Sequence, residues 1–244
     1  MQQASVLVEK SDGLAIVSFD RPEKRNSLSM ELLTGFLAAV SDLRDDASTR
    51  VVILTGKGPA FCAGADLSSL KGVQDLAERQ RLFASSRKRR GRLSHRSYRA
   101  LESLEQTTIA AINGPCVGGG WAIANSCDFR IAADNAQFWF PEVDLGVPVG
   151  ALPTSRLVRM VGLMKAKEMV LTCRRYTAQE LLALGMVQKV VPAVRLMDEA
   201  RALAGVLLAK KPSALSLAKA ILDAAAGHRH LESTVLDRDY FLAE

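Results

Sequence analysis

The sequence has little of what metal sites and disulfide frameworks require. Among 244 residues there are four cysteines, and Cys62, Cys116, Cys127 and Cys173 lie far apart, without a Cys-x-x-Cys pair. This spacing disfavours zinc binding and cross-linking, and favours small buried thiols in a reducing compartment. There are only three histidines, two of them in the polar stretch 227–230, which argues against a histidine triad or metal centre. We therefore expect no metal.

Membrane and nucleotide signatures are also missing. No apolar run approaches the roughly 18 residues of a membrane span, and the N-terminus has neither the basic nor the apolar region of a signal peptide. The glycine triplet 118–120 does not match G-x-G-x-x-G, and no G-x-x-x-x-G-K-[ST] occurs. We expect a cytoplasmic protein that does not associate with membranes.

The positive charge is concentrated in one place. The formal net charge is +6, and the stretch 87–99 is rich in arginine. It could attract the phosphates of a small ligand or bind RNA, but a solvated helix face is the plainer interpretation. Tyr98 is its only aromatic residue, which argues against a stacking platform for single strands. We do not expect a nucleic-acid partner.

Alternating strand and helix patterns predict an α/β protein. β-rich runs flank the turn signal Asp12-Gly13, and from Ser29, a good N-cap, apolar residues recur at helical spacing. The expected strands are 6–8, 14–19, 51–56, 108–113, 129–132, 137–140 and 187–191, and the expected helices are 29–43, 73–105, 121–126, 152–160, 165–172, 178–184, 197–209 and 213–226.

Two loops of small residues, 61–67 and 118–120, follow buried strands and enter helices. Their backbones allow close approach of a ligand, and each offers free N–H groups. If the loops are neighbours in the fold, one donor from each could bind a single carbonyl oxygen and stabilise the charge of an enolate. Two ordinary tight turns are the alternative.

Five ordered segments carry a resemblance to a known family. They are Arg21–Asn26, Ala63–Leu67, Asn113-Gly114 with Gly118–Gly120, Cys127-Asp128, and Pro141-Glu142 with Leu145-Gly146. Together they resemble the crotonase (enoyl-CoA hydratase/isomerase) superfamily over nearly the whole chain. The resemblance implies a spiral of ββα repeats whose C-terminal helices build a homotrimer or a dimer of trimers. We expect residues 1–192 to form the core, and 193–244 a C-terminal helical region that is shorter than in the family.

The same resemblance assigns roles to residues. The backbone N–H groups of Ala65 and Gly119 match the family's oxyanion hole, and Glu142 matches a proton-transferring glutamate. Positions matching coenzyme A contacts are Arg25, Ala63, Ala65, Asp66, Leu67, Ser68 and Gly119. The implied partner is an acyl-CoA thioester, in which coenzyme A is part of the substrate, so we expect no separate cofactor.

One departure from the family pattern concerns Ala122. The family's hydratases carry a glutamate there, which with the second glutamate activates water, whereas alanine does neither. A lone Glu142 suits a Δ3,Δ2-enoyl-CoA isomerase, which moves a proton from C2 to C4. Apolar neighbours should raise the pKa of Glu142. The alternatives are a hydratase that uses another carboxylate, for example Asp144, and a non-catalytic acyl-CoA-binding or RNA-binding homologue.

The remaining candidates are weaker. Trp121 and Trp139 could line the acyl pocket or simply belong to the core, and Asp144 could be a second acid or a surface charge. Acyl-chain length depends on how the segment 72–99 covers the pocket, which the sequence does not specify.

Overall fold

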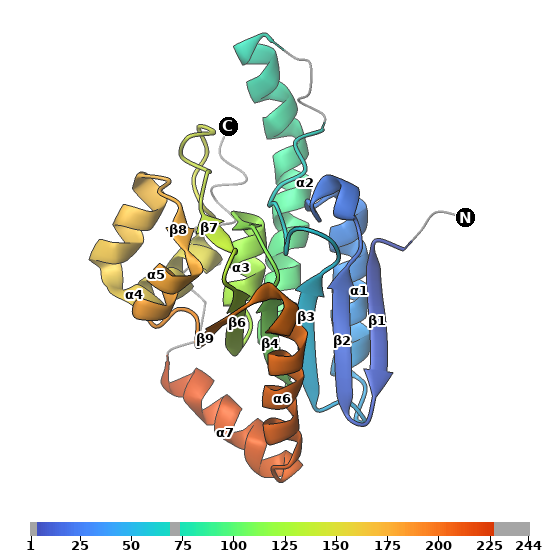
Figure 1. Cartoon of the computed structure of the whole chain (residues 1–244). Helices are drawn as coiled ribbons and strands as arrows, with labels where there is room; N and C mark the ends of the chain where they lie inside the picture. Colours follow the sequence, from blue (N-terminus) through green and yellow to red (C-terminus); the bar gives the residue numbers. More distant parts are fainter. Residues whose placement is uncertain (1–3, 69–73, 227–244) are drawn as a thin grey trace.

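The computed structural model describes residues 4–68 and 74–226 (Figure 1). Its main element is a six-stranded sheet with strand order β1-β2-β3-β4-β6-β9. The strands are β1 (Val6–Ser11), β2 (Leu14–Phe19), β3 (Val51–Gly56), β4 (Thr107–Ile112), β6 (Phe129–Ala133) and β9 (Lys189–Val191). In this sheet β1 and β2 pair in antiparallel orientation, and all other neighbouring strands are parallel. The α/β fold class is confirmed.

The predicted hairpin at the start is present. Ser11 pairs with Leu14, so Asp12 and Gly13 form a two-residue turn in which φ is 50° and 81°. Turns of this kind require positive φ at both positions, which Asp-Gly adopts readily. The turn fixes the register of β1 and β2 at one edge of the sheet.

Helices connect the parallel strands. They are α1 (Met30–Arg44), α2 (Leu76–Glu102) and α3 (Gly119–Asn125), and the 3₁₀ turn η1 (Pro22–Lys24) precedes α1. Ser29 caps α1 as predicted, because its side chain accepts a hydrogen bond of 3.1 Å from Leu32 N. The helix α2 extends beyond the edge of the sheet (Figure 1).

Both faces of the sheet are buried. Ala15, Val17 and Phe19 on β2 pack into a cluster that includes α1 and α3, whereas Ile16 belongs to the cluster of α6 (Leu196–Leu208). The alternation continues through β3 and β4 with a period of two residues. Strands covered on both sides read as continuous apolar runs, which is why β3 was predicted so closely.

A second, three-stranded sheet consists of β5 (Cys116–Val117), β7 (Gln137–Trp139) and β8 (Tyr176–Thr177). The sequence predicted β7 but not β5 or β8, because two-residue strands have no detectable periodicity. Cys116 pairs with Phe138 and Val117 with Trp139. This pairing brings the glycine triplet after β5 close to the Pro141-Glu142 segment after β7.

The remaining chain is largely helical, as predicted. It contains α4 (Ala151–Leu171), α5 (Ala178–Ala183), the 3₁₀ turn η3 (Ala193–Arg195), α6 and α7 (Pro212–Ala225). The two predicted helices 152–160 and 165–172 correspond to α4, which is interrupted at Gly162 with φ 76° and ψ 162°. The predicted domain boundary after residue 192 stays a prediction, and the expected shortening near the C-terminus concerns residues outside those described.

All four cysteines are free and buried. Burial raises the pKa of Cys62 and Cys127 to about 12 and the pKa of Cys116 well above its ordinary value. The prediction of small buried thiols is confirmed. None of the helices in the described parts of the chain combines the length and the hydrophobicity that a membrane-spanning helix requires.

Candidate active site

The two small-residue loops lie side by side. Cys62 N donates a hydrogen bond of 3.2 Å to Pro115 O, and Val117 N donates one of 2.9 Å to Cys62 O. The loops approach so closely that a Cβ on Gly64 would stand 2.8 Å from Val117 O and 3.8 Å from Gly119 N. The neighbouring arrangement that a shared pair of donors requires is therefore present.

The backbone N–H groups of Ala65 and Gly119 are available to a ligand. Leu28 and Ala65 form an isolated parallel β-bridge. Its two hydrogen bonds run from Leu28 N to Gly64 O at 2.7 Å and from Asp66 N to Leu28 O at 3.4 Å, so Ala65 N takes part in neither. Gly119 begins α3, two residues before the predicted helix start, and the N–H groups of a first helical turn have no partner within the helix. Across 4–68 and 74–226, neither N–H donates to a protein acceptor.

Ala65 and Gly119 open onto one cavity of about 150 Å³. Glu142, Ala122 and Phe140 line it as well, together with Val147 and Val149 from the segment before α4. A carboxyl group, two free N–H donors and an apolar wall thus meet in one confined space. Confined apolar sites with a few convergent polar groups are typical ligand sites.

The Glu142 carboxyl group lies against the glycine triplet. A Cβ on Gly118 would stand 2.6 Å from Glu142 Oε1, and Gly118 has φ 50°, so the residue is required to be glycine on both counts. The other oxygen, Oε2, is buried and has no hydrogen-bond partner in the described structure. Burial raises the pKa of Glu142 to about 7, as its apolar setting predicted.

The backbone around Glu142 forms a tight turn. Leu145 N and Val147 N donate to Glu142 O at 3.1 Å and 2.9 Å. Leu145 N also donates to Pro141 O at 3.1 Å, so main-chain hydrogen bonds hold this turn, and Glu142 lines the cavity.

Ala122 lies on the first turn of α3, is buried, and lines the same cavity. Among the described residues that line it, Glu142 is the single carboxylate. The departure from the hydratase pattern therefore occurs inside the site.

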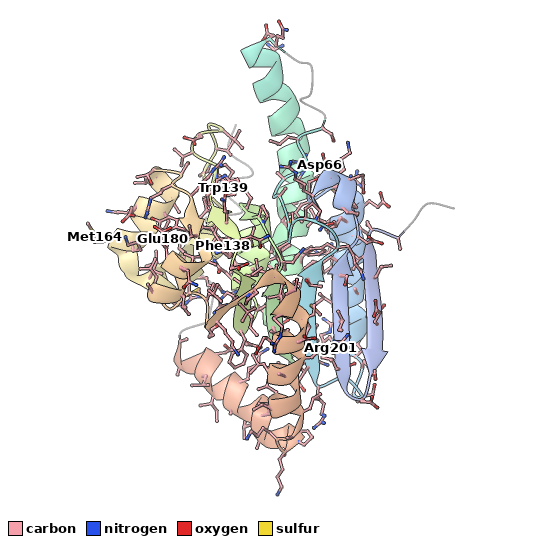
Figure 2. All side chains as sticks on the ribbon, viewed as in Figure 1. Asp66, Phe138, Trp139, Met164, Glu180 and Arg201 are labelled. Carbon is pink, nitrogen blue, oxygen red and sulfur yellow. The ribbon has the colours of Figure 1, made fainter. Side chains whose placement is uncertain are left out.

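The residues predicted to contact coenzyme A lie together beside the cavity. Ala63 N donates a hydrogen bond of 2.9 Å to Arg25 O, which ties the exposed Arg25 to the loop 63–68. Asp66 forms an ion pair with Arg21 at 3.1 Å and accepts a hydrogen bond of 3.0 Å from Ser68 N. Figure 2 places Asp66 next to α2. Of this group, Ala65 and Gly119 line the cavity itself.

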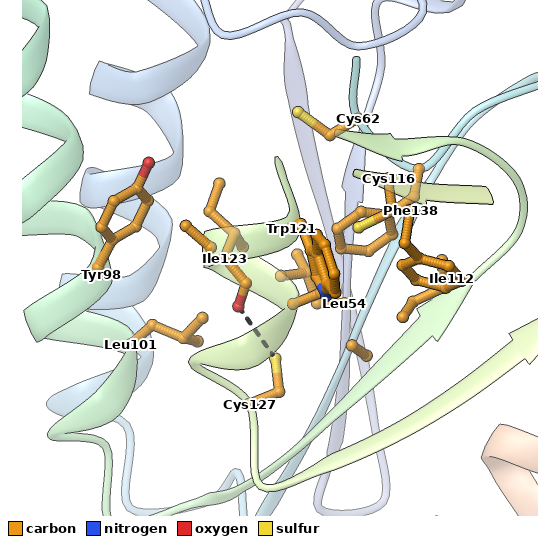
Figure 3. Packing of buried hydrophobic residues seen from close by; sticks show 14 of the residues in the cluster. Leu54, Cys62, Tyr98, Leu101, Ile112, Cys116, Trp121, Ile123, Cys127 and Phe138 are labelled. Atoms are coloured by element: carbon orange, nitrogen blue, oxygen red, sulfur yellow. Dashed lines mark hydrogen bonds between the residues drawn. The ribbon is translucent and has the colours of Figure 1, made fainter. Parts of the chain in front are cut away.

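The structure does not bring Trp121, Trp139 or Asp144 to the cavity. Trp121 is 1% exposed and stacks on Phe140 with ring centroids 4.4 Å apart, so it belongs to the core (Figure 3). The Arg175 guanidinium lies over the Trp139 ring, with its Cζ atom 4.6 Å from the ring centroid. Asp144 is exposed to solvent.

The sequence placed the segment 72–99 over the pocket but did not identify which residues of α2 line it. Five residues of this helix line the cavity, namely Arg90, Gly91, Ser94, His95 and Tyr98. Their spacing of three and four residues marks one helix face, a signal that the dense arginines obscured. The neighbouring Arg89, Arg92, Arg96 and Arg99 are exposed, as the interpretation of a solvated face predicted.

Comparisons with known proteins identify the family of this chain. The family model of enoyl-CoA hydratase/isomerase matches residues 9–243. A short-chain-enoyl-CoA hydratase of Clostridium acetobutylicum is 38% identical over 220 residues, which cover 90% of this chain and 81% of the relative. A putative enoyl-CoA hydratase of Thermus thermophilus is 40% identical over 222 residues, with coverage of 91% and 85%.

Solved structures agree as well. A monofunctional enoyl-CoA isomerase from M. smegmatis is 31% identical, with a TM-score of 0.77 and coverage of 95% of this chain and 98% of the other. An enoyl-CoA hydratase from Mycobacterium avium subsp. paratuberculosis has a TM-score of 0.85 at 27% identity, with coverage of 100% and 96%. Motifs, fold and relatives thus lead to one conclusion, that this chain belongs to the enoyl-CoA hydratase/isomerase family, the crotonase superfamily.

Proposed function

We propose that this member of the family is a Δ3,Δ2-enoyl-CoA isomerase, which converts a 3-enoyl thioester into a 2-enoyl thioester. One observation carries the proposal: among the described cavity-lining residues, Glu142 is the single carboxylate, and the alanine at position 122 leaves it without a partner. Activation of water by a carboxylate pair requires two such groups, whereas a 1,3-proton transfer requires one.

The reaction needs only groups present in the chain. The Glu142 carboxylate removes a proton from C2, and the electrons of the broken C–H bond move onto the thioester oxygen. The N–H groups of Ala65 and Gly119 stabilise that charge. The Glu142 carboxyl group then returns the proton to C4, which restores the thioester carbonyl with a double bond between C2 and C3. Neither water nor a cofactor is consumed.

The acidity of Glu142 supports this role. A pKa of about 7 leaves a substantial fraction in each protonation state near neutral pH. A group that takes and returns the same proton works best when its pKa is near the working pH. Phe140, Val147 and Val149 form an apolar wall in the same cavity as this carboxyl group.

Purified protein offered a 3-enoyl-CoA and, separately, a 2-enoyl-CoA tests the proposal. We expect rapid formation of 2-enoyl-CoA from the first and little 3-hydroxyacyl-CoA from the second. The competing assignment is a hydratase, favoured by the names of the Clostridium and Thermus relatives. Robust hydration of the 2-enoyl-CoA without isomerisation of the 3-enoyl-CoA would establish that assignment instead. Binding of both thioesters without turnover would identify a non-catalytic acyl-CoA binder.

Two further expectations belong to this proposal. Arg25 and the loop 63–68 are proposed to hold the coenzyme A moiety, with the Arg25 guanidinium facing its phosphates. A homotrimer or dimer of trimers is the proposed assembly, and light scattering of the purified chain measures it directly.

A further inference from the structure

Tyr98 brings a hydroxyl group next to Gly119, one of the two proposed oxyanion-hole residues. A Cβ on Gly119 would stand 3.0 Å from the Tyr98 hydroxyl oxygen and 2.7 Å from Leu28 Cδ1. Tyr98 lines the cavity, yet only 7% of the residue is exposed. In Figure 3 its ring extends from α2 towards α3, the helix that Gly119 begins.

We propose that the Tyr98 hydroxyl donates a third hydrogen bond to the thioester oxygen as the enolate forms, beside the N–H groups of Ala65 and Gly119. The inference rests on the proposed function, since it requires a thioester in this cavity. A phenol O–H group can donate one hydrogen bond.

The surroundings of the ring suit such a donor. Tyr98 packs within the main hydrophobic cluster, which also contains Leu28 and Leu101. The apolar part of the side chain is thus fixed in the core, and its polar tip reaches the cavity, as is usual for buried tyrosines. A donor held in place before the charge develops stabilises that charge without reorganisation.

Tyr98 and Glu142 flank the same peptide unit. The Glu142 Oε1 atom lies next to the Cβ position of Gly118, and the Tyr98 hydroxyl lies next to that of Gly119. The peptide between these glycines carries the Gly119 N–H. Two groups beside one peptide can have different roles: Glu142 transfers the substrate proton, and Tyr98 donates a hydrogen bond without losing its proton.

Ser94 and His95 lie on the same wall, one turn earlier in α2. Of the α2 residues, Tyr98 has the polar atom that lies within 4 Å of the Cβ position of Gly119. The tyrosine is therefore the residue to test.

The substitution Tyr98→Phe removes the hydroxyl and keeps the ring. We expect kcat with 3-enoyl-CoA to fall by about 10- to 100-fold, the usual effect of losing a hydrogen bond to a charged group, with little change in KM. The second readout is acetoacetyl-CoA, whose bound enolate absorbs in the near ultraviolet. The apparent pKa of the bound acetoacetyl-CoA should rise by about one to two units, because a change of about 10- to 100-fold in the enolisation equilibrium equals one to two pKa units.

Tyr176→Phe is the matched control. Its hydroxyl donates to Glu168 Oε1 at 2.7 Å and does not line this cavity, so the same chemical change there should leave both readouts unaltered. If Tyr98→Phe matches the wild-type protein in kcat and in enolate absorbance, the Tyr98 inference is overturned and the isomerase proposal stands. A wild-type protein that enolises bound acetoacetyl-CoA but does not isomerise 3-enoyl-CoA overturns the isomerase proposal alone, because the enolate readout still tests Tyr98. A wild-type protein that binds neither thioester overturns both.

Discussion

The Glu142 carboxylate occupies the space that a side chain at position 118 would need: a Cβ there would stand 2.6 Å from Glu142 Oε1. The glycine that turns the chain into α3 therefore also makes room for the proposed proton carrier. The positive φ of Gly118 allows the turn of the loop, and the absence of a side chain leaves space for the Glu142 carboxylate.

We predict that Gly118→Ala impairs catalysis by displacing the Glu142 carboxylate. The expected decrease in kcat is at least tenfold, because misplacement of a reacting group by about 1 Å can cost about 100-fold. Gly185→Ala is the control, since Gly185 has a similar positive φ of 71° but no atom within 4 Å of its Cβ position. Both variants should lose stability, and only the first should lose activity; equal activities would contradict the contact as the cause.

Glu142→Gln should reduce isomerase turnover by about 10²- to 10⁴-fold, since general acid–base catalysis typically contributes this much. The amide keeps the shape of the side chain but takes up no proton. Steady-state kinetics with 3-enoyl-CoA provides the measurement. Asp144→Asn, which makes the same change at an exposed position two residues away, should retain wild-type activity.

The buried carboxyl group also makes stability depend on pH. Burial raises the pKa of Glu142 from 4.5 to about 7, so between these values the folded protein keeps a proton that the unfolded chain has released. The contribution of Glu142 to stability is thus fully present below about pH 4.5 and is lost as the pH rises through 7. Relative to wild type, Glu142→Gln should be more stable by about 3 kcal/mol above pH 8 and similar in stability near pH 4. Urea denaturation at both pH values measures the difference, and a constant difference would contradict the shifted pKa.

Ala122→Glu should restore a carboxylate pair and introduce hydration of 2-enoyl-CoA. Ala122 lines the cavity with Glu142, so the new carboxylate would share the site with the existing one. Like charges so close raise the pKa of one of the two groups, which favours one acid and one base. We expect hydration to rise at least tenfold above the wild-type level. Ala122→Gln supplies similar bulk without the acid, and equal hydration by both variants would argue against a carboxylate role.

Trp121 should matter for folding and little for substrate choice. Its indole stacks on Phe140 and lies outside the cavity lining. Replacing a buried aromatic residue by alanine typically costs about 3–5 kcal/mol, and we expect Trp121→Ala to fall in this range. Chemical denaturation tests it, with Trp139→Ala, a half-buried position, as the milder comparison.

The sequence predicted the fold well where a pattern repeats within one element. The buried strand β3 and the Ser29 cap of α1 follow from apolar runs and local hydrogen bonding. The strands β5 and β8 have only two residues each and exist because β7 lies between them. Pairing of this kind depends on tertiary contacts and leaves no local signal.

The sequence likewise identified some residues of the candidate site and not others. Small-residue loops and the segment around Glu142 could be found because their residue types are unusual at those places. Tyr98 could not, because its contribution depends on which face of α2 turns towards Gly119. The position of Trp121 was equally hidden, since a large aromatic residue beside a pocket and one in the core look alike in a sequence.

Modification of the buried cysteines can report on local opening of the folded chain. Only the thiolate reacts with alkylating reagents, and the raised pKa values of Cys62 and Cys127 keep these groups protonated while the chain is folded. Cys62 and Cys116 belong to the paired loops behind the proposed oxyanion hole, whereas Cys173 follows α4. The order in which mass spectrometry detects their modification would therefore reveal whether the loops open on their own or only when the whole chain unfolds.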